Sequence, residues 1–276
     1  MRSSAFLAAA AAGLLMTSVA TAQPFSSAAT SPRPLPANGI VEGNYPVGEK
    51  ETSYYFAVEL KAGELASQIS FLGRPGADKK LEFSVLNSKG REVASYYIMS
   101  SLDANQEAAR VFAIDGRGSY ILRVRLSGPE TTTFKIAVAG SAFSAAPVKT
   151  TGLSSSFLAP ASLPKDGVIT GSFPGGDRKL TYYYFAVNLK AGDLLTQIGF
   201  SGRKNVDKWL ELALLGANGR EVKSHYVMGG LDAANEATRT LPVDATGSYT
   251  LRVGMKGPEG TSYRIEVGGS AFQAGM

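Results

Sequence analysis

Apolar and polar residues alternate along most of this chain, in short runs that end at turn residues. The clearest run is Tyr54–Gly63, whose one face carries the apolar residues Tyr54, Phe56, Val58 and Leu60. Alternation with a period of two predicts a β-strand with one buried face, and Ala62-Gly63 ends it. Tyr55 is therefore expected on the outer face of its sheet.

Seven further runs are typical of short strands: Ile40–Val41, Leu65–Phe71, Leu81–Leu86, Val93–Met99, Val111–Ile114, Ile121–Leu126 and Phe134–Val138. Turn sequences such as Asn87–Gly90 separate them. The one weakly helical stretch, Leu102–Arg110, lacks the length and the apolar face of a packed helix, so we expect a loop across one end of the fold. Many short strands with turns between them predict an antiparallel sandwich or barrel.

The chain contains this set of runs twice. Tyr183–Gly192 repeats Tyr54–Gly63 with a single change, and the offset of 129 residues continues without a gap to Phe143 and Phe272. More than half of the aligned residues are identical. A unit of roughly a hundred residues can bury its own core. The sequence therefore predicts an all-β protein of two tandem antiparallel β-sandwich domains, module 1 at residues 38–143 and module 2 at residues 166–276.

The segments outside the modules differ in composition. Residues 1–22 combine Arg2, an apolar run and Ala20-Thr21-Ala22, a pattern typical of a secretory signal peptide cleaved before Gln23. A membrane anchor is the alternative, but the apolar run is shorter than the ~20 residues that a spanning helix needs. Residues 23–37 and 144–165 are rich in Pro, Ser and Ala and predict an extended leader and a linker. The alternative for the linker is that its Phe157 and Leu158 dock onto a module surface. We therefore expect a periplasmic or secreted protein with no transmembrane segment in the mature chain.

Composition and charge exclude several function classes. The net charge of +5 comes from residues outside the modules, namely Arg2, Arg33, Lys149 and Lys165, and each module is nearly neutral. Nucleic-acid binding needs a clustered basic surface, so it is not expected. The chain has no Cys, which excludes disulfides and thiol chemistry.

The sequence offers little for catalysis, so the chain is predicted not to be an enzyme. His225 is the only His, and no Ser lies in a Gly-x-Ser-x-Gly motif. One His without Cys does not make a zinc site. The carboxylate pairs Asp103/Glu107 and Asp232/Glu236 could in principle serve a glycosidase. On polar loops beside arginines, we expect them to be solvated ion pairs instead.

Binding residues are suggested by the tyrosines of the repeated strand. Tyr55 and its counterpart Tyr184 are expected on the outer face, where an exposed Tyr suits a sugar ring or an extended peptide. Ordinary strand propensity is the alternative explanation. The candidate ligand-binding set is completed by carboxylates identical in both copies, with loop-holding salt bridges as the alternative: Asp103, Asp232, Glu107 and Glu236. Two weak sites in one chain would favour a repetitive ligand.

The strand Tyr54–Leu60, the turn at Gly90 and the ending Gly118–Val124, with their counterparts in module 2, resemble the bacterial pre-peptidase C-terminal domain family. The resemblance implies jelly-roll-like sandwiches that accompany secreted enzymes as non-catalytic appendages, some of which bind calcium or extracellular polymers. This sequence departs from that pattern because it has no peptidase domain. The acidic residue expected directly before Leu-x-Leu is displaced to Asp78 and Asp207. No cofactor is expected, and no motif supports calcium.

These features favour an exported, non-catalytic binding protein of the bacterial envelope. Its expected ligand is a repetitive extracellular or cell-wall polymer, either a polysaccharide or an extended protein, bound through the duplicated modules. The alternative is a structural or assembly protein whose sandwiches pair with themselves or with other envelope proteins.

Overall fold

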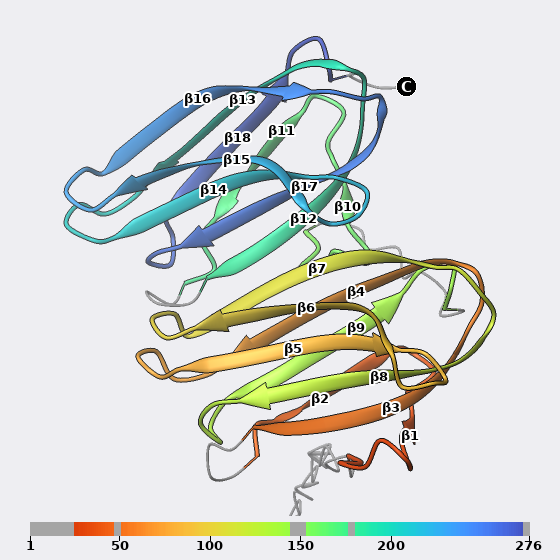
Figure 1. Cartoon of the computed structure of the whole chain (residues 1–276). Helices are drawn as coiled ribbons and strands as arrows, with labels where there is room; N and C mark the ends of the chain where they lie inside the picture. The colour runs from red at the N-terminus through yellow and green to blue at the C-terminus, as the bar shows by residue number, and fades with distance from the viewer. Residues whose placement is uncertain (1–24, 47–50, 144–152, 176–179, 273–276) are drawn as a thin grey trace, which may run out of the picture.

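A computed structural model describes residues 25–46, 51–143, 153–175 and 180–272. These residues form strands, turns and loops without a helix, arranged as two β-sandwiches with one junction between them (Figure 1). No helix in this part of the chain is long and apolar enough to cross a membrane. The expected signal peptide, residues 1–22, lies outside the described residues.

Module 1 is a jelly roll, which confirms the predicted fold class. Its first sheet has the order β2-β9-β4-β7, formed by β2 (Ile40–Asn44), β9 (Thr133–Ala139), β4 (Gly63–Leu72) and β7 (Asn105–Ile114). Its second sheet has the order β1-β3-β8-β5-β6, formed by β1 (Arg33–Pro34), β3 (Thr52–Leu60), β8 (Gly118–Ser127), β5 (Lys79–Leu86) and β6 (Glu92–Ser100). Nearly every connection crosses from one sheet to the other, as jelly-roll connectivity requires.

Module 2 repeats this topology strand by strand. One sheet has the order β11-β18-β13-β16, with β11 (Val168–Ser172), β18 (Ser262–Gly268), β13 (Gly192–Ser201) and β16 (Ala234–Val243). The facing sheet has the order β10-β12-β17-β14-β15, with β10 (Ala161–Ser162), β12 (Thr181–Leu189), β17 (Gly247–Lys256), β14 (Lys208–Leu215) and β15 (Glu221–Gly229).

The inner faces of the two sheets enclose one apolar core in each module. In β3, Phe56, Val58 and Leu60 are buried and Tyr54 packs partly buried against them, as the alternation predicts. The equivalent face of β12 contributes to the core of module 2. Removing these side chains from water, at about 25 cal/mol per Å² of apolar surface, is the main stabilising term of each sandwich.

The expected loop at Leu102–Arg110 is wrong for most of its length. Strand β7 begins at Asn105, and β4 pairs with it without interruption from Gly63↔Ile114 to Leu72↔Asn105. Pairing with a long neighbouring strand outweighs a weak local helical preference. Module 2 behaves in the same way, because β16 begins at Ala234.

The segments expected to be leader and linker pack against the modules. β1 and β10 each add a short parallel strand beside β3 and β12. The Phe25 ring lies 4.7 Å from the Tyr54 ring, centroid to centroid. Residues 25–37 and 153–165 therefore act as an N-terminal strap on the module that follows each of them.

The two modules also pack directly against each other. Strand β7 of module 1 covers part of the outer face of the β12-β17-β14 sheet, and a separate buried cluster fills the junction: Ala109, Phe157, Tyr184, Ala213 and Leu215. Backbone atoms bond across it, since the Val111 N–H donates to the Asn218 carbonyl at 2.9 Å. The junction thus joins different surfaces of two similar modules.

Candidate binding cleft between the modules

The two tyrosines predicted to mark a duplicated site lie in different environments. Tyr184 stands on the outer face of its sheet, as the strand alternation predicts, but module 1 covers it and leaves only 1% of its surface exposed. Its hydroxyl donates to Glu107 Oε1 at 2.6 Å. Tyr55 is half-buried on the outer face of module 1. The expectation that both tyrosines are exposed is therefore wrong, because Tyr184 belongs to the junction.

Two of the predicted carboxylates also lie at the junction rather than in a solvated pair. Asp103 Oδ1 is 3.2 Å from Lys256 Nζ, an ion pair between the modules. Glu107 lies beneath module 2, and burial raises the pKa of its carboxyl to about 7. The hydrogen bond from Tyr184, the charge of Arg252 and a hydrogen bond from Gln68 act in the opposite direction and lower that pKa.

The counterparts of these carboxylates in module 2 are open to solvent. Asp232 and Glu236 are exposed, and Glu236 Oε2 accepts a hydrogen bond from Gln197 at 3.3 Å. No group of three or more His, Asp or Glu residues that could hold a metal ion occurs among the described residues. In each of the three pairs of counterparts, one residue therefore lies at the junction (Tyr184, Asp103 and Glu107). The other lies outside it (Tyr55, Asp232 and Glu236).

A different set of residues forms an aromatic platform on the outer face of module 2. Trp209 on β14 and Tyr182 on β12 lie on either side of Gly254 on β17. A Cβ atom on Gly254 would lie 2.9 Å from each of the two rings, so the rings can close over this position only because it is glycine. The Arg252 guanidinium lies 5.2 Å from the centroid of Tyr182. We call Trp209, Tyr182 and Gly254 the aromatic platform.

The same three positions of module 1 carry Lys80, Ser53 and Arg125. Here the surface is held by ion pairs to Glu82, whose carboxylate lies 3.1 Å from Lys80 Nζ and 3.6 Å from Arg125 Nη1. One location in the fold is thus charged in module 1 and aromatic in module 2. The two modules share a scaffold and differ in the surface they present.

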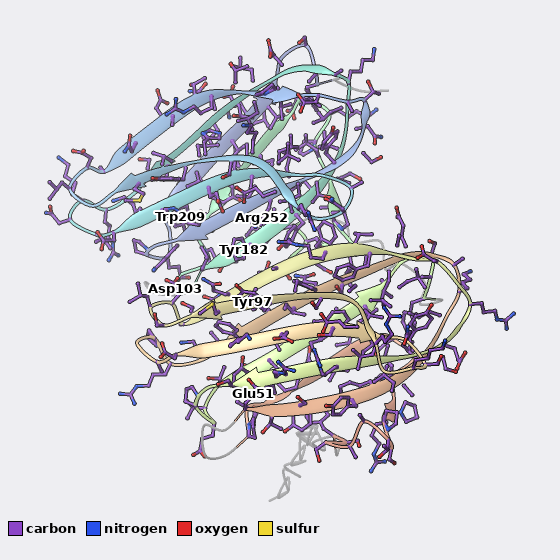
Figure 2. The ribbon with its side chains drawn as sticks, viewed as in Figure 1. Glu51, Tyr97, Asp103, Tyr182, Trp209 and Arg252 are labelled. Carbon is purple, nitrogen blue, oxygen red and sulfur yellow. The ribbon has the colours of Figure 1, made fainter. Side chains whose placement is uncertain are left out.

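Trp209 of the platform lines a cleft between the modules with a volume of about 1270 Å³. Tyr182 lies behind it, partly buried against the junction cluster. Lining residues from the two modules include Leu102, Asp103, Trp209, Met228 and Lys256. Figure 2 shows Trp209 and Tyr182 on the side of module 2 toward the junction, with Asp103 and Tyr97 on the adjoining side of module 1. Leu102 is 81% exposed and Met228 is 58% exposed. Ligand sites are often found at domain interfaces, where apolar walls carry a few placed polar groups.

The lysines that line the cleft are already bound to other groups. Lys256 is paired with Asp103. The Lys208 ammonium donates to three backbone carbonyls, those of Arg203 (2.5 Å), Val206 (3.1 Å) and Asp232 (2.9 Å). Asp207 adds a carboxylate to the lining. The cleft therefore favours an uncharged ligand over an anionic one.

The platform occupies positions at which the sequences of the two modules differ, whereas the predicted site residues are identical in both modules. The signal in the sequence was the only Trp of the chain, placed at an outward position where module 1 has Lys80. The contribution of Leu102 and Asp103 could not be foreseen, because it depends on how the modules dock.

Comparisons with known proteins do not assign a family. No protein-family profile matches the chain, and no curated protein matches it. The resemblance to the pre-peptidase C-terminal domain therefore rests on the strand motifs alone.

Three solved structures show the degree of similarity, and all three are distant. The tandem CBM22-1–CBM22-2 domain of Paenibacillus barcinonensis Xyn10C is 10% identical, with 83% of this chain and 90% of that chain covered at a TM-score of 0.24. The isomalto-dextranase of Arthrobacter globiformis T6 is 12% identical, with 82% and 36% covered at 0.27. The PBSX exported protein XepA is 9% identical, with 84% and 88% covered at 0.22. Scores this low support no conclusion about function.

Proposed function

We propose that this protein is an exported, non-catalytic binding protein that holds an extracellular polysaccharide in the cleft between its modules. Trp209, the ring of the aromatic platform that lines the cleft, is the observation that carries the proposal. The flat apolar face of a pyranose ring packs well on an aromatic ring, while hydrogen-bonding groups at the rim engage its hydroxyls. Asp103 and Lys256 supply such groups beside Trp209.

The positions of the titratable residues favour binding over catalysis. His225 is buried in module 2, with Nε2 2.8 Å from Thr196 Oγ1. Glu107 is covered by Tyr184. Neither group is among the residues that line the cleft, so the imidazole and the carboxyl whose pKa burial raises are set apart from the proposed ligand. The carboxylates in the lining are Asp103, which is paired with Lys256, and Asp207.

The substitution Trp209→Lys tests the proposal. It places at this position the residue that module 1 already carries there, Lys80, so the sandwich should fold and melt as the wild type does. Loss of one large aromatic contact, worth roughly 1–3 kcal/mol, should weaken binding by about 5- to 150-fold. Affinity electrophoresis and calorimetry with soluble β-glucan, xylan and dextran would measure this loss.

Lys135→Ala on β9 removes an exposed lysine of the other sheet of module 1, so it is the control and should leave binding unchanged. Wild-type protein that retains none of these polysaccharides would contradict the proposal. Equal retention by wild type and Trp209→Lys would also contradict it.

A further inference from the structure

The outer edge strands of both modules present the same exposed side chains. On β6 the residues that face solvent are Val93, Ser95, Tyr97 and Met99, and on β15 they are Val222, Ser224, Tyr226 and Met228. The two sets are identical in residue type. The residues between them differ at each position: Ala94, Tyr96 and Ile98 against Lys223, His225 and Val227. All of these except the exposed Lys223 are buried or partly buried. Packing constraints act on the inner face, so they do not explain identity on the outer one.

Three of the four exposed residues on each strand, all but the serine, are large and apolar. Tyr97 is 58% exposed and Tyr226 is 60% exposed. Single exposed apolar side chains are normal in soluble proteins, but contiguous ones mark interaction surfaces. We call Val93, Tyr97 and Met99 the β6 stripe, and Val222, Tyr226 and Met228 the β15 stripe.

The two stripes are continuous with the cleft. Met228 of the β15 stripe pairs in register with Trp209, so this stripe adjoins the aromatic platform. The β6 stripe is followed by Leu102, which lines the same cleft as Met228 and Trp209. Figure 1 shows β6 and β15 on the same side of the molecule, one in each module. The cleft thus lies between the two stripes, with Met228 of the β15 stripe in its lining and Leu102 three residues beyond Met99 of the β6 stripe.

We propose that the polysaccharide site extends out of the cleft along both stripes, with Tyr97 and Tyr226 as additional positions that bind sugar rings. This inference rests on the proposed function and specifies its ligand. The ligand is an extended, uncharged polysaccharide whose chain crosses from module 1 to module 2. A short oligosaccharide would occupy only the cleft.

Charge and geometry both favour this class of ligand. Lys80 Nζ lies 5.3 Å from the centroid of Tyr97, but it is paired with Glu82 at 3.1 Å, so it offers little attraction to an anionic polymer. An added peptide strand would bind through the backbone at the sheet edge. The stripes instead lie on the outer face of the sheet, where side chains and not backbone groups are presented. An outer sheet face that presents tyrosine side chains suits the stacking of sugar rings.

The experiment measures the affinity of the full chain for short and long members of one uncharged series, for example β-glucan oligosaccharides and soluble β-glucan, with xylan and dextran in parallel. Tyr97→Ala should weaken binding of the long chains by about tenfold and leave the short ones unchanged. Trp209→Lys should weaken both. Leu72→Ala, which removes an exposed apolar side chain on β4, is the matched control and should alter neither.

The outcomes separate the two proposals. Full affinity of Tyr97→Ala for long chains, with binding lost in Trp209→Lys, would confine the site to the cleft and overturn the inference while the proposed function stands. Equal loss for short and long chains in Tyr97→Ala would also overturn it. Retention of polygalacturonate in preference to uncharged chains would overturn the ligand class. If Trp209→Lys has no effect on any chain, the proposed function fails.

Discussion

At the scale of single residues, a buried ammonium group orders the loop beside the cleft in each module. Lys79 and Lys208 are only 2% and 3% exposed. Lys79 Nζ donates to the carbonyls of Arg74 and Ala77, both at 2.7 Å, and burial lowers the pKa of this lysine, while the nearby charges of Asp103 and Asp78 raise it. The loops held in this way contribute lining residues of the cleft.

Replacement of Lys208 by Met should destabilise the protein by about 2–4 kcal/mol. The substitution keeps much of the side-chain volume but leaves three buried or partly buried carbonyls without their donor. Urea unfolding of the variant would measure the change in free energy. Lys204→Met, at an exposed position of the same loop, is the control and should alter stability by less than about 0.5 kcal/mol. Equal stability of the two variants would contradict the role assigned to Lys208.

Sequence patterns could not indicate these lysines. A charged residue just before an apolar run is ordinarily solvent-exposed, since Lys is almost never fully buried without partners. The partners here are backbone carbonyls of a loop, and the sequence does not specify which way such carbonyls point. The contact between Tyr182 and Gly254 could not be predicted for a related reason. It joins neighbouring strands, and the sequence alone does not give their pairing.

At the scale of strands, alternation was sufficient to locate all eight principal strands of module 1 and to assign the inner face of β3. It failed at Asn105–Arg110, where the local composition is polar and only the partner strand β4 makes the segment extended. Composition also failed for the first strap, because a segment rich in Pro, Ser and Ala is not expected to pack, although it contains Phe25. For the second strap, the docking of Phe157 and Leu158 that the sequence allowed is what the structure has.

Phe25 should anchor the first strap to module 1. Its ring packs against Tyr54, Phe56 and Phe134, with centroid separations of 4.7, 6.0 and 5.8 Å. Phe25→Ala should therefore lower the stability of module 1 by about 1–3 kcal/mol, since the site is half-buried and can relax in part.

Thermal and urea unfolding of Phe25→Ala would test this, with Leu102→Ala as a control in which an exposed apolar side chain is removed. A strap that contributes nothing would give the same unfolding curve for Phe25→Ala and wild type. Because β1 pairs with β3, proteolysis within residues 25–37 should also become faster in the Phe25 variant.

At the scale of the whole molecule, the junction is asymmetric, and that asymmetry determines which copy of each surface is free. Each surface that forms the junction has a counterpart in the other module that lies outside the junction, and these counterparts are more polar. Ala109 and Val111 of β7 correspond to Thr238 and Thr240, and Tyr182 corresponds to Ser53. The two surfaces that meet within one chain are thus apolar, whereas the equivalent surfaces outside the junction are more polar. A second chain is therefore less able to repeat the same contact, which disfavours open-ended assembly.

Docking of the modules should depend on pH through Glu107. Its carboxyl is held under module 2 by the Tyr184 hydroxyl at 2.6 Å and faces Arg252 and Gln68. The pKa is raised from 4.5 to about 7 in the docked state, so this state binds a proton that an undocked, solvated Glu107 has already released between pH 4.5 and 7. Docking is therefore strongest below about pH 4.5 and weakens progressively until the pH reaches about 7, by about 3 kcal/mol in total.

Glu107→Gln keeps a hydrogen-bonding group beside Tyr184 but removes the titration. The variant should remain docked at pH 8 and should lose the part of the pH dependence that is due to this group. Small-angle scattering and proteolysis near residues 144–152, each followed from pH 5 to pH 8, would measure docking. Glu236→Gln changes the equivalent but exposed residue of module 2 and should behave as the wild type does. An unchanged pH profile in Glu107→Gln would show that the charge of Glu107 does not govern the junction, and the cleft that depends on the junction would then keep its shape across this pH range.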